Sequence, residues 1–168
     1  MASTQTWSEF NGSGATETTS RAEANWKRID DSTTAYSSSP INSSNNENSM
    51  AKIQAVKFAG TWNSLSAGTY KIDNNAPATG LSIRGAVLTT YTQPSTTATG
   101  DAALSTTGIS FGFGTSATPF STAGGSSTTA GGTMFANALR TQLQTTSSYA
   151  GGPGDIATRT ITATWTES

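Results

Sequence analysis

The side chains that most often carry out acid–base chemistry are scarce in this sequence. It contains no His and no Cys, so it cannot form a Ser–His–acid triad, a Cys nucleophile or a His- or Cys-based zinc site. No spacing among the carboxylates singles out a pair that could face each other across a glycosidic bond. We therefore expect no enzymatic activity and read the carboxylates as scattered and solvated. They are Glu9, Glu17, Glu23, Asp30, Asp31, Glu47, Asp73, Asp101, Asp155 and Glu167.

Oxygen ligands for Ca²⁺ could come from Asp30 and Asp31 together with Asn45, Asn46 and Glu47. Their spacing does not match a calcium-binding loop, and Asx-rich loops commonly bond their own backbone instead. The glycine-rich phrases GFGTS and AGGSSTTAGG lack the GK[ST] that a phosphate-binding loop needs. We therefore predict no metal and no cofactor.

Basic side chains fall on the predicted strands at Lys52, Lys57, Arg84, Arg140 and Arg159. They could meet an acidic partner surface, but a solvated sheet face that discourages edge pairing is the simpler interpretation for any one of them. The net charge is −1, so there is no broad basic field to hold nucleic acid.

Hydroxyl side chains dominate the composition, with 32 Thr and 24 Ser among 168 residues. Thr is β-branched and suits the half-wet surface of a strand. The length fits one domain, or one domain with an arm. No apolar run approaches the roughly 20 residues that span a bilayer, and the start, MASTQTW, does not resemble a secretory signal. We therefore expect no association with a membrane.

Alternating apolar residues predict strands in TQTWSEF, MAKIQAVKF, SLSAGTYKID, LSIRGAVLTTYT, GISFGFG and ATRTITATWT. The segment MFANALRTQLQTT fits a helix by its four-residue spacing and a strand by its alternation. We favour the strand because its neighbours are β-like and no helix cap precedes it. Short strands between Gly, Pro, Asn and Ser turns predict an all-β fold, an antiparallel β-sandwich of the jelly-roll or Ig-like kind.

The predicted organisation has two parts. Residues 1–49 form an irregular N-terminal arm and loop region, partly packed on the domain, and residues 50–168 form the sandwich. The Gly/Ser/Thr-rich stretch 115–133 is expected to be a long surface loop. We expect the N-terminal arm to contact a partner, so that deleting residues 1–20 leaves a soluble fold but abolishes binding.

The last strand should turn Ile161, Ala163 and Trp165 to the core and its Thr row to water. The N-terminal TWSE could lie beside this strand or reach a neighbouring subunit. Aromatic residues in irregular segments could serve the core or anchor an interface. For binding a partner the candidates are Trp7, Phe10, Trp26 and Ile41, with Trp7 the first to test.

Three phrases, TWSEFNGSG, SSSPINSSNNENSMAKIQAVKFAGTWNSLS and LRTQLQTTSSYAGGPGDIATRTITATWTES, resemble a group of small tailed-bacteriophage virion proteins. In that group a TWSE-like start precedes a Pro-containing loop, a strand ending in FxGT-like residues, and a closing LQLQTTSS-like phrase with a Thr-rich strand. The shared phrases are strands and turns rather than catalytic signatures. The resemblance implies a structural component of the particle.

What the resemblance implies is a capsid cement or decoration protein that forms homo-oligomers on the virion and binds the major capsid protein. Such a protein would be assembled in the host bacterial cytoplasm. One alternative is a protein associated with the tail, neck or fibre. Another is a β-sandwich adhesion module that binds a surface glycan through exposed Trp or Tyr side chains.

Overall fold

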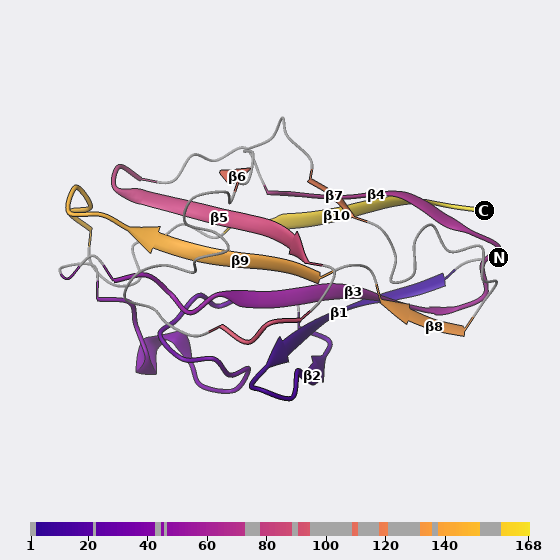
Figure 1. The fold of residues 1–168 in the computed structure, drawn as a ribbon, viewed down its shortest axis with the longest axis horizontal. Coiled ribbons are helices and arrows are strands. Elements are labelled where there is room, and N and C mark those ends of the chain that lie inside the picture. The colour runs from indigo at the N-terminus through magenta and orange to yellow at the C-terminus, as the bar shows by residue number, and fades with distance from the viewer. Residues whose placement is uncertain are drawn as a thin grey trace.

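The computed structural model describes residues 3–21, 23–42, 45, 47–72, 78–88, 91–94, 109–110, 118–120, 132–135, 138–151 and 159–168. Within these ranges the chain forms strands and one 3-10 turn, η1 (Tyr36–Ser38), and no α-helix (Figure 1). The all-β prediction is therefore confirmed. No helix in this described part is long and apolar enough to cross a membrane.

Seven antiparallel strands form the larger sheet, in the order β2-β1-β3-β9-β5-β6, and β8 also pairs with β3 (Figure 1). Their bounds are β1 (Ser3–Asn11), β2 (Thr16–Thr19), β3 (Lys52–Gly60), β5 (Leu81–Leu88), β6 (Ile109–Ser110), β8 (Gly132–Phe135) and β9 (Ala138–Thr145). The longest pairing joins β1 to β3, from Ser3 opposite Gly60 to Phe10 opposite Ile53.

A smaller antiparallel sheet has the order β10-β4-β7. It comprises β4 (Leu65–Ile72), β7 (Thr118–Phe120) and β10 (Ile161–Glu167). One apolar core draws on both sheets. It contains Val56, Phe58, Trp62, Leu65, Tyr70, Ile72, Leu81, Ile83, Leu139 and Leu143. Ring contacts cross from sheet to sheet, with Phe58 of β3 meeting Trp165 of β10 edge-on at 5.1 Å.

Most of the predicted strands are present, because β-branched and aromatic residues favour extended backbone. In β5, for example, Leu81, Ile83 and Val87 lie on one face of the strand. The helical alternative for MFANALRTQLQTT is wrong, since residues 138–145 form β9. Strand β7 and the start of β8 fall inside the stretch 115–133 that we predicted to be loop. The rest of that stretch, and Phe111 and Phe113 of GISFGFG, lie outside the described residues.

The last strand follows the predicted alternation. Ile161, Ala163 and Trp165 pack against the core, whereas Thr164 and Thr166 are exposed. The TWSE strand does not pair with it, because β1 pairs with β3 and β2.

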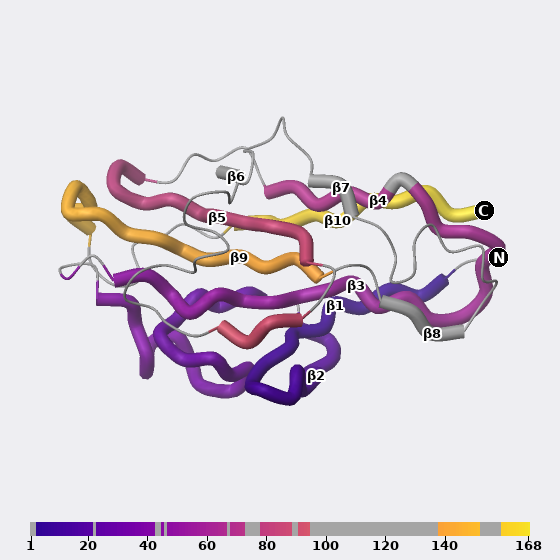
Figure 2. The backbone as a smooth tube through the Cα atoms, viewed as in Figure 1, coloured from indigo at the N-terminus to yellow at the C-terminus, as the bar shows by residue number. Residues whose placement is uncertain are grey.

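The two described ends of the chain meet at one end of the molecule (Figure 2). Glu167 accepts hydrogen bonds from the backbone N–H of Ser3 at 2.8 Å and from its hydroxyl at 2.6 Å.

The N-terminal strand β1 is internal to the larger sheet, with β2 on one side and β3 on the other (Figure 2). Ser8, Glu9 and Asn11 on this strand are buried. Removing residues 1–20 would therefore expose a long edge of β3 and part of the core. We now expect this deletion to unfold the domain, the reverse of the expectation from sequence.

Candidate functional site

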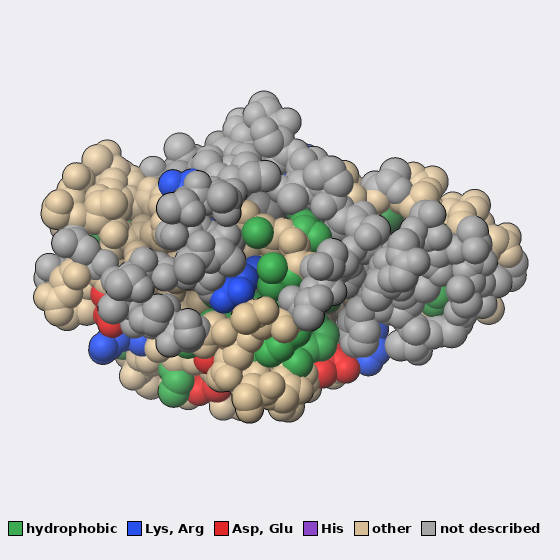
Figure 3. Space-filling model, in the orientation of Figure 1, with side chains coloured by type: hydrophobic (Ala, Val, Ile, Leu, Met, Phe, Trp, Pro, Cys, Tyr) green, Lys and Arg blue, Asp and Glu red, His purple; other side chains and the backbone are tan. Residues whose placement is uncertain are grey.

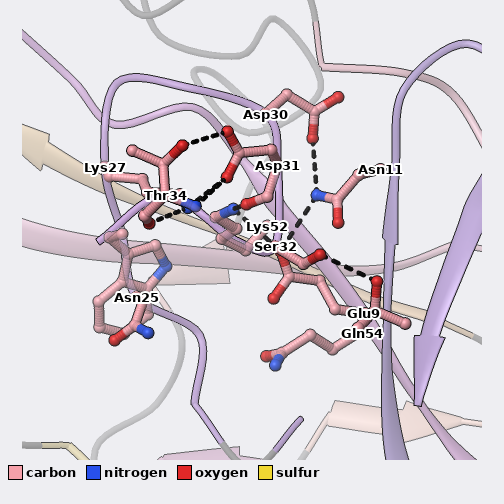
Figure 4. A network of polar contacts seen from close by, with 12 residues as sticks. Glu9, Asn11, Asn25, Lys27, Asp30, Asp31, Ser32, Thr34, Lys52 and Gln54 are labelled. Atoms are coloured by element: carbon pink, nitrogen blue, oxygen red, sulfur yellow. Dashed lines mark hydrogen bonds and ion pairs between the residues drawn. The ribbon is translucent and has the colours of Figure 1, made fainter. Parts of the chain in front are cut away.

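The core-facing side of β3 changes character along its length. Val56 and Phe58 lie in the apolar core. Lys52 and Gln54 share their face, because side chains alternate along a strand, and both are buried. The segment 23–42, named here the 23–42 loop, contacts Lys52 and Gln54 through backbone oxygens of Asp31 and Glu23. This polar end of the sheet, with the loop that contacts it, is the candidate functional site (Figure 4).

A buried ion pair joins the first two long strands. Lys52 Nζ of β3 lies 3.0 Å from Glu9 Oε1 of β1, and the two side chains are only 1% and 2% exposed. The Lys52 ammonium also donates to the backbone carbonyl of Asp31 at 2.8 Å. Burial lowers the pKa of Lys52, and the Glu9 charge opposes that shift. The pair therefore fixes the 23–42 loop to the sheet through Asp31.

A second ion pair lies within the loop. Lys27 Nζ, also 1% exposed, lies 2.7 Å from Asp31 Oδ1 and donates to the Thr34 carbonyl. Asp31 accepts the N–H groups of Thr33 at 3.0 Å and Thr34 at 2.8 Å, and the Thr34 hydroxyl at 2.7 Å. Burial alone would raise the pKa of Asp31, but the hydrogen bonds from Lys27 and Thr34 hold it well below its usual range.

The neighbouring Asp30 ties the loop to the turn after β1. Its Oδ1 accepts from Asn11 Nδ2 at 2.9 Å, and its Oδ2 accepts from the Gly12 N–H at 2.9 Å. The Tyr91 hydroxyl donates to the Gly12 carbonyl at 2.7 Å. Burial, with the Asp30 charge, raises the pKa of Tyr91 to about 12, so this phenol stays protonated and keeps donating at neutral pH.

One backbone hydrogen bond closes the loop on itself, and a second joins it to the residues just before β3. The Arg28 N–H donates to the Ser39 carbonyl at 3.1 Å, and the Met50 N–H donates to the Lys27 carbonyl at 2.8 Å. Arg28 Nε also lies 2.7 Å from Glu47 Oε1. A backbone hydrogen bond thus joins the two ends of the segment between Arg28 and Ser39. The buried ammonium groups of Lys27 and Lys52 bind Asp31 within it.

Two large apolar side chains point outward from this closed segment. Among the described residues, Ile29 at 43% and Tyr36 at 57% are the exposed large hydrophobics. Neither residue was among the partner-binding candidates from the sequence, where Ile29 and Trp26 indicated only a short anchor. The sequence contains only a weak signal for their exposure. Ile29 stands between Arg28 and Asp30, and Tyr36 precedes a Ser run. In such contexts a large apolar residue has few neighbours in the sequence to cover it.

The four predicted partner-binding residues have different surroundings. Trp7, Trp26 and Ile41 all pack against the apolar core. The Trp7 ring lies 5.7 Å from that of Tyr70, and Trp26 Nε1 donates to Thr141 Oγ1 at 3.1 Å. Phe10 is half-buried near the end of β1. The structure thus brings three of them to one core, and their role in binding a partner stays a prediction.

The solvated sheet face is wrong for two of the basic residues, and the interpretation of the carboxylates as solvated is wrong for one of them. Lys52 is 1% exposed, Arg140 is 4% exposed and Glu9 is 2% exposed. Burial lowers the pKa of Arg140. Lys57 is partly buried and pairs with Glu17 at 3.0 Å. The interpretation failed because pairing and tertiary cover, rather than strand position, decide whether a charged side chain meets water.

On the face drawn in Figure 3, basic and acidic side chains of the described residues are scattered and form no extended field of one sign. The described part of the chain contains no group of three or more acidic side chains that could hold a metal ion. Asp31 bonds the backbone of its own loop, as is common for Asx-rich loops. Within these residues, the charges position a loop.

No protein-family model, no curated protein and no solved structure matches the chain.

Proposed function

We propose that this protein is a non-enzymatic structural component of a tailed-bacteriophage particle, specifically a cement or decoration subunit that binds the major capsid protein. We further infer that the two sheets form a β-sandwich of the jelly-roll or Ig-like kind. The chain alternates between the sheets, since β3 and β5 belong to the larger one and β4 to the smaller, and one core draws on both.

The observation that carries the proposal is the exposure of Ile29 and Tyr36 on a loop anchored by buried charges. Large apolar and aromatic side chains supply much of the binding free energy at protein interfaces. A loop that already has one conformation loses less conformational entropy when it binds. The 23–42 loop therefore combines contact residues with preorganisation.

The sequence supports the same reading. The phrases TWSEFNGSG and LRTQLQTTSS resemble small virion proteins, and the chain lacks His and Cys. A subunit of this size gains from repetition, because many copies, each with a modest contact, stabilise a shell together. Copies would be related by closed symmetry.

The test is co-sedimentation of the purified protein with shells assembled from the major capsid protein. The double variant Ile29→Ser/Tyr36→Ser should bind with roughly tenfold or greater loss of affinity, since truncated interface anchors commonly cost more than about 1 kcal/mol each. The matched control is Lys71→Ser at an exposed position of β4, which should bind like the wild type.

Two results would contradict the proposal. A folded double variant that decorates shells normally would remove the 23–42 loop from the interface. A wild-type protein that ignores shells but binds purified tails would favour a tail, neck or fibre-associated protein instead.

The glycan-binding alternative has less support. Trp62 is buried, and Trp7, Trp26 and Trp165 pack against the core, so the tryptophans do not present a row of exposed rings. Tyr36 is the aromatic side chain best placed to stack on a sugar. Binding of the wild type, but not of Tyr36→Ser, on a glycan array would revive this alternative.

A further inference from the structure

The end of the β1–β3 pairing brings an amine, a carboxamide and a carboxylate together in a buried place. The last register pair is Phe10 opposite Ile53, so Asn11, the last residue of β1, comes opposite Lys52, the first residue of β3. Side chains opposite each other on antiparallel strands have neighbouring Cβ atoms. Lys52 and Asn11 therefore extend from adjacent positions on one face of the sheet.

Glu9 lies on the same face as Asn11, two residues earlier on β1. Its Oε1 is 3.0 Å from Lys52 Nζ and 3.0 Å from Asn11 Nδ2 (Figure 4). One carboxylate oxygen thus contacts both nitrogens. All three side chains are buried, at 1%, 2% and 8% exposure for Lys52, Glu9 and Asn11. Within the described residues, the buried Oδ1 of Asn11 has no hydrogen-bond partner.

From this geometry we propose that Lys52 and Asn11 form an intramolecular isopeptide bond, with Glu9 as the catalytic acid–base. The nucleophile is the Lys52 amine, the electrophile is Cγ of Asn11, and the leaving group is the Asn11 amide nitrogen. The product is a covalent link between β1 and β3. This inference goes beyond the proposed function and does not depend on it.

The atoms and charges of this reaction balance without a cofactor or an oxidant. Glu9 takes a proton from the Lys52 ammonium, and the freed lone pair on Nζ attacks Cγ of Asn11. Glu9 returns that proton to Nδ2 as the Cγ–Nδ2 bond breaks. The other proton that Nζ loses also leaves with the departing nitrogen. One ammonium and one carboxamide thus become one secondary amide and one ammonium ion.

The surroundings favour each step. Burial lowers the pKa of Lys52, which increases the fraction of neutral, nucleophilic amine. A carboxylate held within hydrogen-bond reach of both the donor and the leaving group is suited to general acid–base catalysis. The sheet register holds the reactants side by side, which removes most of the entropic cost of bringing them together.

A competing reaction at the same residue has a different outcome. Asn11 precedes Gly12, and attack of the Gly12 nitrogen on Cγ would also expel ammonia but would give a cyclic imide without a cross-link. That nitrogen is engaged, since the Gly12 N–H donates to Asp30 Oδ2 at 2.9 Å. The experiment must separate these two reactions.

The test is mass spectrometry of the full-length protein, incubated folded at neutral pH and then denatured. We expect an intact mass lower than that of the sequence by one ammonia. After tryptic digestion we expect residues 1–21 joined to residues 29–57, because trypsin does not cleave after an acylated Lys52. Lys52→Arg and Glu9→Gln should each show the full sequence mass.

Lys27→Arg is the matched control, because Lys27 is the other lysine that is 1% exposed and ion-paired, and this variant should keep the link. The proposal is overturned if the wild type has its full sequence mass, or if ammonia is lost only within residues 1–21. Loss of water instead of ammonia would also overturn it, because the link would then be to a carboxylate. The wild-type peptides decide the question even if a variant fails to fold.

Discussion

The face of the larger sheet that meets the core has two halves that are stabilised differently. Around Phe58 it meets the smaller sheet through apolar and aromatic side chains. Around Lys52 it meets the 23–42 loop through ion pairs and hydrogen bonds. Apolar burial is non-directional and stabilises many arrangements of the same atoms, whereas buried charges need particular partners. We therefore expect the apolar half to contribute most of the stability and the charged half to specify the conformation of one loop.

The largest loss of stability should come from a substitution in the apolar half. Phe58 is 0% exposed, and Phe58→Ala should lower the free energy of unfolding by about 3–5 kcal/mol, because it leaves a cavity against Trp165. Urea denaturation followed by circular dichroism would measure this. A loss below about 1 kcal/mol would mean that the two sheets do not depend on this contact.

Lys27→Met should lower the free energy of unfolding less than Phe58→Ala does. It should disturb the 23–42 loop more than it disturbs the sheet. The change removes the bonds to Asp31 and the Thr34 carbonyl and should cost about 2 kcal/mol, as for hydrogen bonds to charged groups. Hydrogen exchange of the Thr33 and Thr34 amides should accelerate more than that of β3. Equal acceleration in both places would show that the loop is not a separate unit.

The stability that Asp31 contributes to the charged half should depend on pH. Because the pKa of Asp31 is lowered in the folded state, its contribution is present above its unfolded pKa of about 4 and is lost as the pH falls through the lower folded value. At pH 7 Asp31→Asn should cost about 1 kcal/mol, the difference between charged and neutral hydrogen bonds. That cost should shrink as the solution is acidified below about pH 4. Paired urea titrations of wild type and variant test this, and a cost independent of pH would contradict it.

The smallest effect should be at the Ser3–Glu167 contact. Ser3 lowers the pKa of Glu167 through hydrogen bonds from its hydroxyl and its backbone N–H. This contact lies at the edge of the molecule, where water competes with it. Glu167→Gln should leave the urea midpoint unchanged within error. A clear shift would place this contact among the interactions that stabilise both sheets.

The strands could be predicted from the sequence because their signal is local. In LSIRGAVL and ITATWTE, side chains of alternate character define the inner and outer faces without any knowledge of partners. The choice of strand for residues 138–145 was also available from alternation.

The candidate site could not be predicted in the same way, because its members are distant in the chain. Lys52 and Glu9 are separated by 43 positions, and each alone is typical of a solvated strand residue. For Trp7 and Trp26 the sequence left a core role and an interface role open, and the structure shows that both pack against the core. Only the β1–β3 register and the path of the 23–42 loop reveal which charges share a site.

The contact between Ser3 and Glu167 has a geometric consequence for anything fused to the chain. Both ends lie at the right of Figure 1, whereas the short coil of η1, which begins with Tyr36, lies at the lower left. A peptide or reporter attached to either end of the chain would therefore lie at the same end of the molecule, far from η1. If the 23–42 loop binds a capsid shell, the fused peptide or reporter would lie on the side of the subunit that faces away from the shell. The subunit would then display it on the particle surface.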